Sequence, residues 1–317
     1  MIRNVILKAN FTNIQEFLLI GLKDLNQFQI PVFMLFFTFY VATIAGNLLI
    51  IVLVSISQGC QSPMYFLLGH LSLCDILIST NVAPNTLKVI ILGRSPISYH
   101  TCLIQMILFG GSAFIECCLL TVMSYDRFLA ICSPLRYTSI MNQNRCCYLV
   151  LWTWITGFLF SVMAYLLVLV LQFCGPNIID HFFCDLAPLL ELSCSDTSAL
   201  EIHVSVIASG MCVSQLIFVI ITYVCIFISI LKITPMSGRK KVFSTCSSHL
   251  IVVSIYYGTL ITLYLAPARG YSLNLNKSLS LFNTIVTPLF NPLIYSLKNK
   301  EIRKATAKLF SKDSIQP

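Results

Sequence analysis

"HTCLIQMILFGGSAFIECCLLTVMSY", His100–Tyr125, is a long apolar stretch in which Glu116 is the single charged residue. Directly after it, Asp126 and Arg127 stand side by side, and the chain then turns apolar again. About 20 apolar residues are enough to cross a bilayer as an α-helix. The stretch therefore predicts a membrane-spanning helix that reaches the membrane surface at Asp126 and Arg127.

Six further stretches almost lack Asp, Glu, Lys and Arg, and each is long enough to span a bilayer. They are Pro31–Ile56, Pro63–Leu87, Cys146–Phe173, Ile202–Leu231, Val242–Ala268 and Ser278–Leu297. Only 10% of the 317 residues are charged, whereas a soluble domain carries about 25%. We therefore predict an all-α membrane protein, a seven-transmembrane helix bundle formed by one domain over residues 1–317. The expected helices are about 29–57, 63–88, 99–133, 144–172, 201–232, 239–267 and 272–297.

The basic residues predict the orientation of this bundle. If the amino terminus is extracellular, 13 of the 20 Lys and Arg residues fall in cytoplasmic parts, and basic residues gather on that side of membranes. The net charge of +8 is then a sign of topology and not of nucleic-acid binding. Asn10-Phe11-Thr12 is a glycosylation sequon in the extracellular tail, and Asn276-Lys277-Ser278 is a second, closer to the membrane.

"KNKEIRKATAKLF" follows the last apolar stretch and places Ile302, Ala305 and Leu309 on one face among basic residues. The pattern predicts a short amphipathic helix, about 299–310, lying on the anionic cytoplasmic leaflet. A solvated tail is the alternative.

Most of the 14 cysteines lie within predicted helices, where Cys acts as a small hydrophobe. Cys102, Cys174, Cys184 and Cys194 are extracellular, where oxidising conditions favour disulfides. Four cysteines allow three pairings, and the sequence alone does not choose among them. A zinc site that combines them with His181 is conceivable but disfavoured.

Asp75 and Glu116 are the acids that remain inside the predicted membrane spans, each near the middle of its helix. Intramembrane charges are costly and usually functional. Two neighbouring carboxylates resist joint ionisation, so either one is protonated or a cation such as sodium lies between them. A membrane protease would also use paired carboxylates, but it needs a water-accessible cleft that nothing else supports.

Several motifs, in order along the chain, resemble those of olfactory receptors within the rhodopsin-like G-protein-coupled receptors. They are "GNLL" (Gly46–Leu49), "SPMYFLLGHLSLCD" (Ser62–Asp75), "MSYDRFLAICSPLRYTSIM" (Met123–Met141), "FCGPNIIDHFFCDLAPLLELSC" (Phe173–Cys194), "GRKKVFSTCSSHL" (Gly238–Leu250) and "TPLFNPLIYSLKNKEIRKA" (Thr287–Ala305). The resemblance covers the whole chain. Departures such as Phe128 in place of a usual tyrosine affect details of coupling only.

The resemblance implies that Cys102 pairs with Cys184, and Cys174 with Cys194. It also implies a plasma-membrane protein that activates a stimulatory, olfactory-type G protein and raises cyclic AMP. The residues expected to switch the G protein are Asp126, Arg127, Tyr223, His249, Asn291, Pro292 and Tyr295.

We expect a small volatile odorant to bind in the outer half of the bundle, below the Cys174–Cys194 loop. Four predicted helices each turn one face toward this site. These faces carry Phe109, Gly110, Ala113 and Phe114 on the third helix, Ile207, Ala208 and Met211 on the fifth, Tyr257, Leu260, Ile261 and Tyr264 on the sixth, and Leu281 and Thr284 on the seventh. None is acidic or basic, which predicts a neutral, mostly apolar ligand. Arg269 and Lys277 are the basic residues near this site. A loop that folds inward could bring either of them to the carboxylate of a ligand.

Other classes of protein fit less well. A transporter or channel would need broken helices or a polar path across the membrane, and only Asp75 and Glu116 cluster. No nucleophile–base or metal constellation indicates an enzyme. An opsin needs a lysine deep in the last helix, and an amine receptor usually has an Asp within 103–115, where none occurs. A receptor of another branch is the remaining alternative. No cofactor is expected other than the sodium ion.

Overall fold

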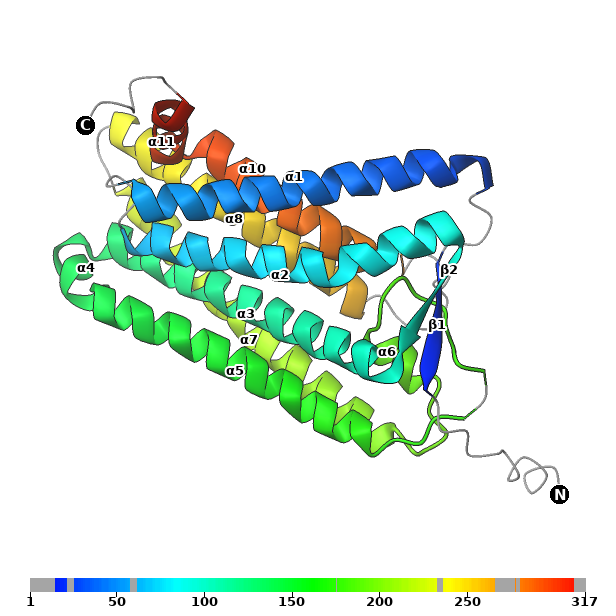
Figure 1. Ribbon diagram of the computed structural model, residues 1–317. Coiled ribbons are helices and arrows are strands. Elements are labelled where there is room, and N and C mark those ends of the chain that lie inside the picture. The colour runs from blue at the N-terminus through cyan, green and yellow to red at the C-terminus, as the bar shows by residue number, and fades with distance from the viewer. Residues whose placement is uncertain are drawn as a thin grey trace.

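The computed structural model describes residues 15–21, 26–57, 62–174, 176–232, 236–265, 277 and 280–310. Long helices lie side by side along one direction (Figure 1). They are α1 (Gln29–Ile56), α2 (Pro63–Leu92), α3 (Tyr99–Cys132), α5 (Gln143–Leu169), α7 (Ser198–Leu231) and α8 (Met236–Leu265). The π-helical turn η5 (Phe282–Val286) and α10 (Thr287–Lys298) form the last long helix.

Shorter elements connect them: η3 (Asn26–Phe28), α4 (Pro134–Ile140), α6 (Leu186–Leu190) and α11 (Lys300–Phe310). The bounds differ from the sequence prediction by three residues or more in four places. α7 begins at Ser198 instead of near 201, and α8 begins at Met236 instead of near 239. α2 continues to Leu92 instead of ending near 88, and α5 ends at Leu169 instead of near 172. Residues 266–276 lie outside the described residues, and with them the predicted start of the last helix.

Local sequence explains where several helices begin and end. Ser98 precedes α3 and its Oγ accepts a hydrogen bond from Thr101 N at 3.2 Å, while Asn142 Oδ1 does the same for Arg145 N at 2.9 Å before α5. Such caps satisfy N–H groups that lack a partner within the helix. Gly93 ends α2 at φ 72°, a left-handed conformation that glycine adopts without steric cost.

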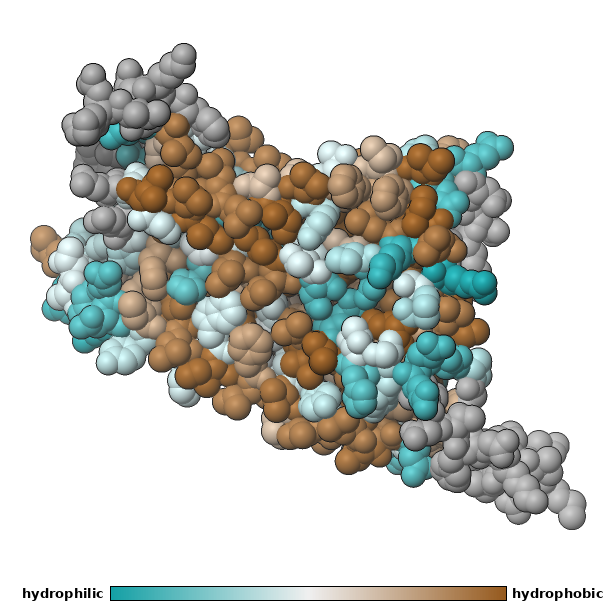
Figure 2. All heavy atoms as spheres, in the orientation of Figure 1, coloured by the Kyte–Doolittle hydropathy of each residue, from teal (hydrophilic) through white to brown (hydrophobic). Residues whose placement is uncertain are grey.

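The helices present apolar side chains to their surroundings. Among the described residues, α1, α2, α3, α5 and the Ser209–Leu231 part of α7 are each long and apolar enough to cross a membrane. α8 contributes a shorter apolar stretch, Cys246–Ile261. Figure 2 shows brown, hydrophobic residues over most of the visible face of the bundle, with teal residues gathered toward its two ends. This is the surface expected of a protein solvated by lipid.

α3 is the central helix, because it packs against α2, α5, α7 and α8. Glycines allow its closest approach to α5. A Cβ at Gly157 would lie 2.4 Å from Ile115 Cγ1 and 3.0 Å from the Gly111 carbonyl oxygen. Residues on α3 can therefore take part in contacts on several sides of the bundle.

A small sheet, which we did not predict, covers one end of the bundle. Its strands are β1 (Glu16–Ile20), β2 (Arg94–Ser98) and β3 (Ile178–Ile179), in the order β2-β1-β3. β1 pairs antiparallel with β2 and parallel with β3. We call this end of the bundle the sheet end; α4 and α11 lie at the opposite end, the α11 end (Figure 1).

α11 is helical as predicted, but part of its apolar face packs on protein. Ile302 is fully buried and Ala305 packs against the same core, whereas Leu309 is 37% exposed. Asn299 precedes the helix, and its Oδ1 accepts from Glu301 N at 3.0 Å and from the Tyr65 hydroxyl at 3.0 Å. The bundle therefore fixes where α11 begins, and only its far end is left free to meet lipid.

Candidate ligand site and cytoplasmic switch

At the α11 end, Arg127 is held by its neighbour. Arg127 Nη2 and Nε donate to Asp126 Oδ2 at 2.6 and 3.0 Å. The Tyr137 hydroxyl, from α4, donates to Asp126 Oδ1 at 2.8 Å. Burial and the Asp126 carboxylate raise the pKa of Tyr137, so its hydroxyl stays protonated and remains a donor. Both oxygens of the Asp126 carboxylate, which is fully buried, are thus hydrogen-bonded.

Three of the other predicted switch residues, Tyr223, His249 and Tyr295, lie on the helices next to this pair. The Tyr223 hydroxyl and His249 Nδ1 are 2.5 Å apart, and their rings are stacked with centroids 5.9 Å apart. The hydroxyl of Tyr295 is buried and has no hydrogen-bond partner in the described part of the chain. These three residues come from helices in contact, since α3 packs against α7 and α8, and α8 packs against α10. The structure therefore brings together the side chains from α3, α7, α8 and α10 that the sequence grouped.

Pro292 interrupts the backbone hydrogen bonds of the last helix, and α1 supplies a substitute donor. Pro292 has no N–H, so the Pro288 carbonyl loses its usual helical donor. Asn47 Nδ2 donates to that carbonyl at 3.0 Å. Gly46 makes room for the approach, since a Cβ there would lie 3.1 Å from Pro292 Cβ and Cγ. Within the "GNLL" motif, Asn47 thus satisfies the Pro288 carbonyl, and Gly46 lets α1 approach Pro292.

Asp75 and Glu116 meet in the middle of the bundle through Asn291. Asn291 Nδ2 lies 3.0 Å from each Asp75 oxygen and 3.3 Å from Glu116 Oε1. Asp75 is fully buried, and Glu116 is 3% exposed. Ser79, one helical turn from Asp75, has a buried hydroxyl without a hydrogen-bond partner among the described residues. One amide cannot neutralise two carboxylates, so joint ionisation of this buried pair is unfavourable.

Beside this cluster and nearer the sheet end, two predicted ligand residues, Tyr257 and Phe109, contact other parts of the bundle. The Phe109 ring meets the Phe183 ring edge-on, with centroids 5.0 Å apart. The Tyr257 hydroxyl lies 3.2 Å from Cys117 Sγ, and the neighbouring Tyr256 donates to the Ala113 carbonyl at 2.7 Å. α3 and α8 thus contact one another where the ligand was predicted.

Other predicted ligand residues are buried or half-buried near the same region. Leu281 and Thr284 are buried, and Thr284 Oγ1 donates back to the Ser280 carbonyl at 3.0 Å. Ile207, Met211 and Leu260 are half-buried. The side chains of Ala208 and Tyr264 lie outside the described residues, as does Asn10.

Three predicted ligand residues are better explained by helix packing or exposure. The Phe114 ring stacks on Phe160 of α5, with centroids 5.2 Å apart. A Cβ at Gly110 would lie 3.4 Å from Ser161 Oγ of the same helix. Ile261 is 41% exposed, on the outside of the bundle. These three placements favour structural roles, because each side chain or Cβ position points toward α5 or away from the protein.

Both predicted disulfides are confirmed. Cys102 pairs with Cys184 and Cys174 with Cys194. The first ties the start of α3 to Phe183 and its neighbours in the connection between α5 and α7, residues 170–197. The second closes a loop within this connection. This connection therefore covers the sheet end of α3.

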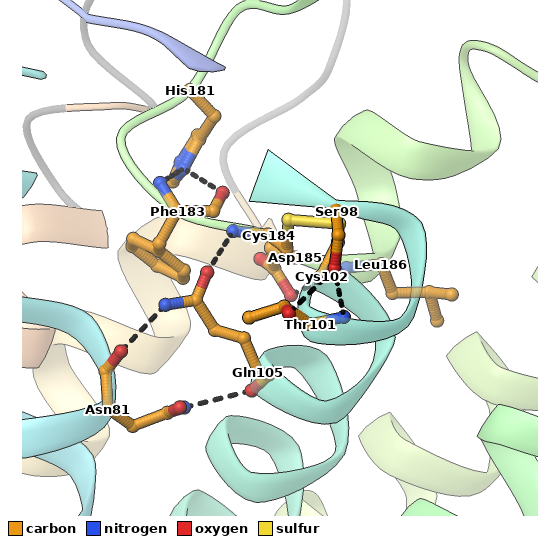
Figure 3. The surroundings of a disulfide bond; sticks show 10 residues. All are labelled: Asn81, Ser98, Thr101, Cys102, Gln105, His181, Phe183, Cys184, Asp185 and Leu186. Carbon is orange, nitrogen blue, oxygen red and sulfur yellow. Dashed lines mark hydrogen bonds between the residues drawn. A yellow bond between two sulfur atoms is a disulfide. The ribbon is translucent and has the colours of Figure 1, made fainter. Parts of the chain in front are cut away.

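Two polar contacts at the sheet end were not predicted. Lys277 Nζ lies 2.5 Å from Asp180 Oδ1, and the lysine side chain is only 4% exposed. Gln105 Oε1 accepts a hydrogen bond from Cys184 N at 2.9 Å, beside the disulfide (Figure 3). Each joins residues far apart in sequence, so no local pattern could have revealed it.

A seven-helix membrane bundle with a paired Asp-Arg at one end and a disulfide-anchored loop at the other is the architecture of a G-protein-coupled receptor. Comparisons with known proteins define the family more narrowly. Residues 36–313 match the family model for the olfactory receptor. The chain is 43% identical over 303 residues to olfactory receptor 5G26 of Mus musculus, which covers 96% of this chain and 95% of that protein.

Two further relatives agree with this match. The identity is 44% over 315 residues to olfactory receptor 5P60 of Mus musculus, covering 97% of each chain. It is 42% over 305 residues to olfactory receptor 8H1 of Homo sapiens, covering 96% of this chain and 98% of that protein. The chain belongs to the olfactory receptor family. It is a multi-pass membrane protein with seven transmembrane helices, and this family is not enzymatic.

Proposed function

We propose that this receptor binds a small, volatile, neutral and mostly apolar odorant in the half of the bundle nearest the sheet. The observation that carries the proposal is the ion pair between Lys277 and Asp180, in which the buried ammonium already has a carboxylate partner. A ligand carboxylate would have to displace Asp180 to reach it. Burying an ionised ligand without a counter-charge would cost several kcal/mol.

The chemistry of the surrounding side chains supports the same ligand class. Phe109, Ala113, Leu260 and Leu281 offer apolar surface, on which each buried CH₂ contributes about 0.8 kcal/mol. The Tyr257 hydroxyl, which lies 3.2 Å from Cys117 Sγ, is the group that would orient one carbonyl or alcohol. A ligand of this size would bind with a dissociation constant in the micromolar range, about −8 kcal/mol.

We further propose that Arg127 engages a stimulatory, olfactory-type G protein once α8 moves outward, and that cyclic AMP rises as a result. The sheet end is then extracellular and the α11 end cytoplasmic, at the plasma membrane. A sodium ion or a shared proton would lie between Asp75 and Glu116 in the resting receptor and rearrange on activation.

Matched analogues test the ligand class. Cyclic AMP would be measured in cells that express the chain, with an acid, an amine, an alcohol and a ketone on one carbon skeleton. We expect the ketone or the alcohol to be the strongest agonist, and Tyr257→Phe to weaken it while surface expression is retained. A receptor that answers best to the acid, and loses that response in Arg269→Ala, would overturn the proposal.

A further inference from the structure

Three residues on one face of α3 hold the same short segment of the covering connection. Cys102, Gln105 and Phe109 follow one another at helical spacing. Cys102 forms the disulfide with Cys184, and Gln105 Oε1 accepts from the Cys184 N–H at 2.9 Å. The Phe109 ring packs against Phe183 with centroids 5.0 Å apart. The segment is thus fixed covalently, by a hydrogen bond and by an aromatic contact.

Gln105 also joins this segment to α2. Its Nε2 donates to the Asn81 carbonyl at 2.6 Å, and Asn81 Nδ2 donates back to the Gln105 carbonyl at 2.9 Å (Figure 3). The side chain of Gln105 is buried, with 3% of the residue exposed. The contact on α2 lies one turn before Pro84, which interrupts the backbone hydrogen bonds of that helix.

The carboxamide is the group that this position requires. It must donate to a carbonyl oxygen on one side and accept from an N–H on the other, and a primary amide does both. A glutamate of the same length would only accept when ionised, and a leucine would do neither. Leaving a buried backbone N–H or carbonyl without a partner is unfavourable.

Phe183 is the side chain that this arrangement positions. It is fully buried, and the His181 ring packs edge-on against it, with centroids 4.6 Å apart. Burial lowers the pKa of His181, so the ring is neutral at neutral pH and adds no charge above the site. The Phe183 ring therefore contacts both His181 and Phe109, and Phe109 is one of the proposed ligand residues of α3.

We propose that Gln105 is a positioning residue that fixes Phe183 and thereby limits the length of the ligand that the receptor accepts. Gln105 itself does not touch the ligand. The statement about ligand length rests on the proposed function, whereas the statement about the position of residues 183 and 184 does not.

Hydrogen–deuterium exchange of the purified full chain tests the position of the segment without any ligand. In Gln105→Leu we expect the Cys184 amide to exchange roughly three- to tenfold faster than in the wild type, since one hydrogen bond is lost. Gln105→Glu keeps an acceptor for that amide but loses the donor to the Asn81 carbonyl, so its exchange should be slower than in Gln105→Leu. Gln143→Leu, an exposed position at the start of α5, is the matched control. Unchanged exchange in Gln105→Leu would overturn the proposal.

A homologous series of straight-chain ketones tests the effect on ligand length. Cyclic AMP responses, normalised to surface expression, should fall off less steeply with chain length in Gln105→Leu than in the wild type or Gln143→Leu. An equal loss for every ketone would show a merely structural role and overturn the length limit. If neither these ketones nor the matched alcohols activate the wild type, the proposed ligand class fails, while the exchange result still decides whether Gln105 fixes the segment.

Discussion

At the scale of single residues, the Asp126–Arg127 pair combines strong local bonding with a position at the end of α3. The guanidinium makes two hydrogen bonds to its neighbour and is 14% exposed, so it is accessible once that neighbour releases it. We expect Arg127→Ala to abolish agonist-stimulated cyclic AMP with surface expression largely intact. Asp126→Asn, which removes the opposing charge, should raise basal cyclic AMP. A full agonist response in Arg127→Ala would remove the assigned role.

Asn291 makes the acidic cluster an interdependent unit, because its single amide nitrogen contacts both Asp75 and Glu116. Asp75→Asn removes one charge and the repulsion that would otherwise require a shared proton or cation. We expect the variant to change basal activity and to lose sensitivity to sodium. Dose–response curves in sodium and in an equimolar organic cation would measure this. If potency, basal activity and sodium sensitivity all stayed as in the wild type, the cluster would be structural only.

At the scale of elements, β1 is held by alternating side chains. Phe17 and Leu19 are fully buried, and the Phe17 ring contacts Phe173 edge-on with centroids 5.8 Å apart. Leu18, on the other face, is half-buried. Leu19→Ala should therefore destabilise the sheet end by about 2–5 kcal/mol, and Leu18→Ala, the same chemical change, by clearly less. Thermal unfolding of the two purified variants would measure the difference. Equal losses would mean that β1 does not pack as described.

Elements that follow from composition could be predicted, and those that depend on distant partners could not. The long helices were predicted because each apolar stretch must satisfy its own backbone in lipid. β1 was missed because "EFLLI" is short, and its partners β2 and β3 come much later in the chain. Local periodicity carries no information about such pairs.

The same limit applies to the candidate site. Phe109 and Phe114 lie on a broad arc of α3, and helical spacing could not tell that Phe114 faces Phe160 of α5 while Phe109 faces Phe183. Lys277 was recognised as a basic residue near the site, but Asp180, which neutralises it, could be identified only from the fold. Helical spacing thus indicated a broad interior face, on which Ile261 was wrongly included, and the packing determined the partners of the others.

At the scale of the whole molecule, the charge distribution predicts one orientation in the membrane. Basic residues gather at the α11 end, which should be cytoplasmic, and the Asn10 sequon then lies on the opposite, glycosylated side. Treatment of the expressed chain with an N-glycosidase should increase its electrophoretic mobility, and Asn10→Gln should abolish that change. Thr12→Ala, which destroys the sequon but keeps the asparagine, should behave identically.

An antibody against an amino-terminal tag should stain intact cells, whereas a carboxyl-terminal tag should need permeabilisation. Staining of the carboxyl-terminal tag on intact cells would reverse the orientation, and Arg127 could then not meet a cytoplasmic G protein.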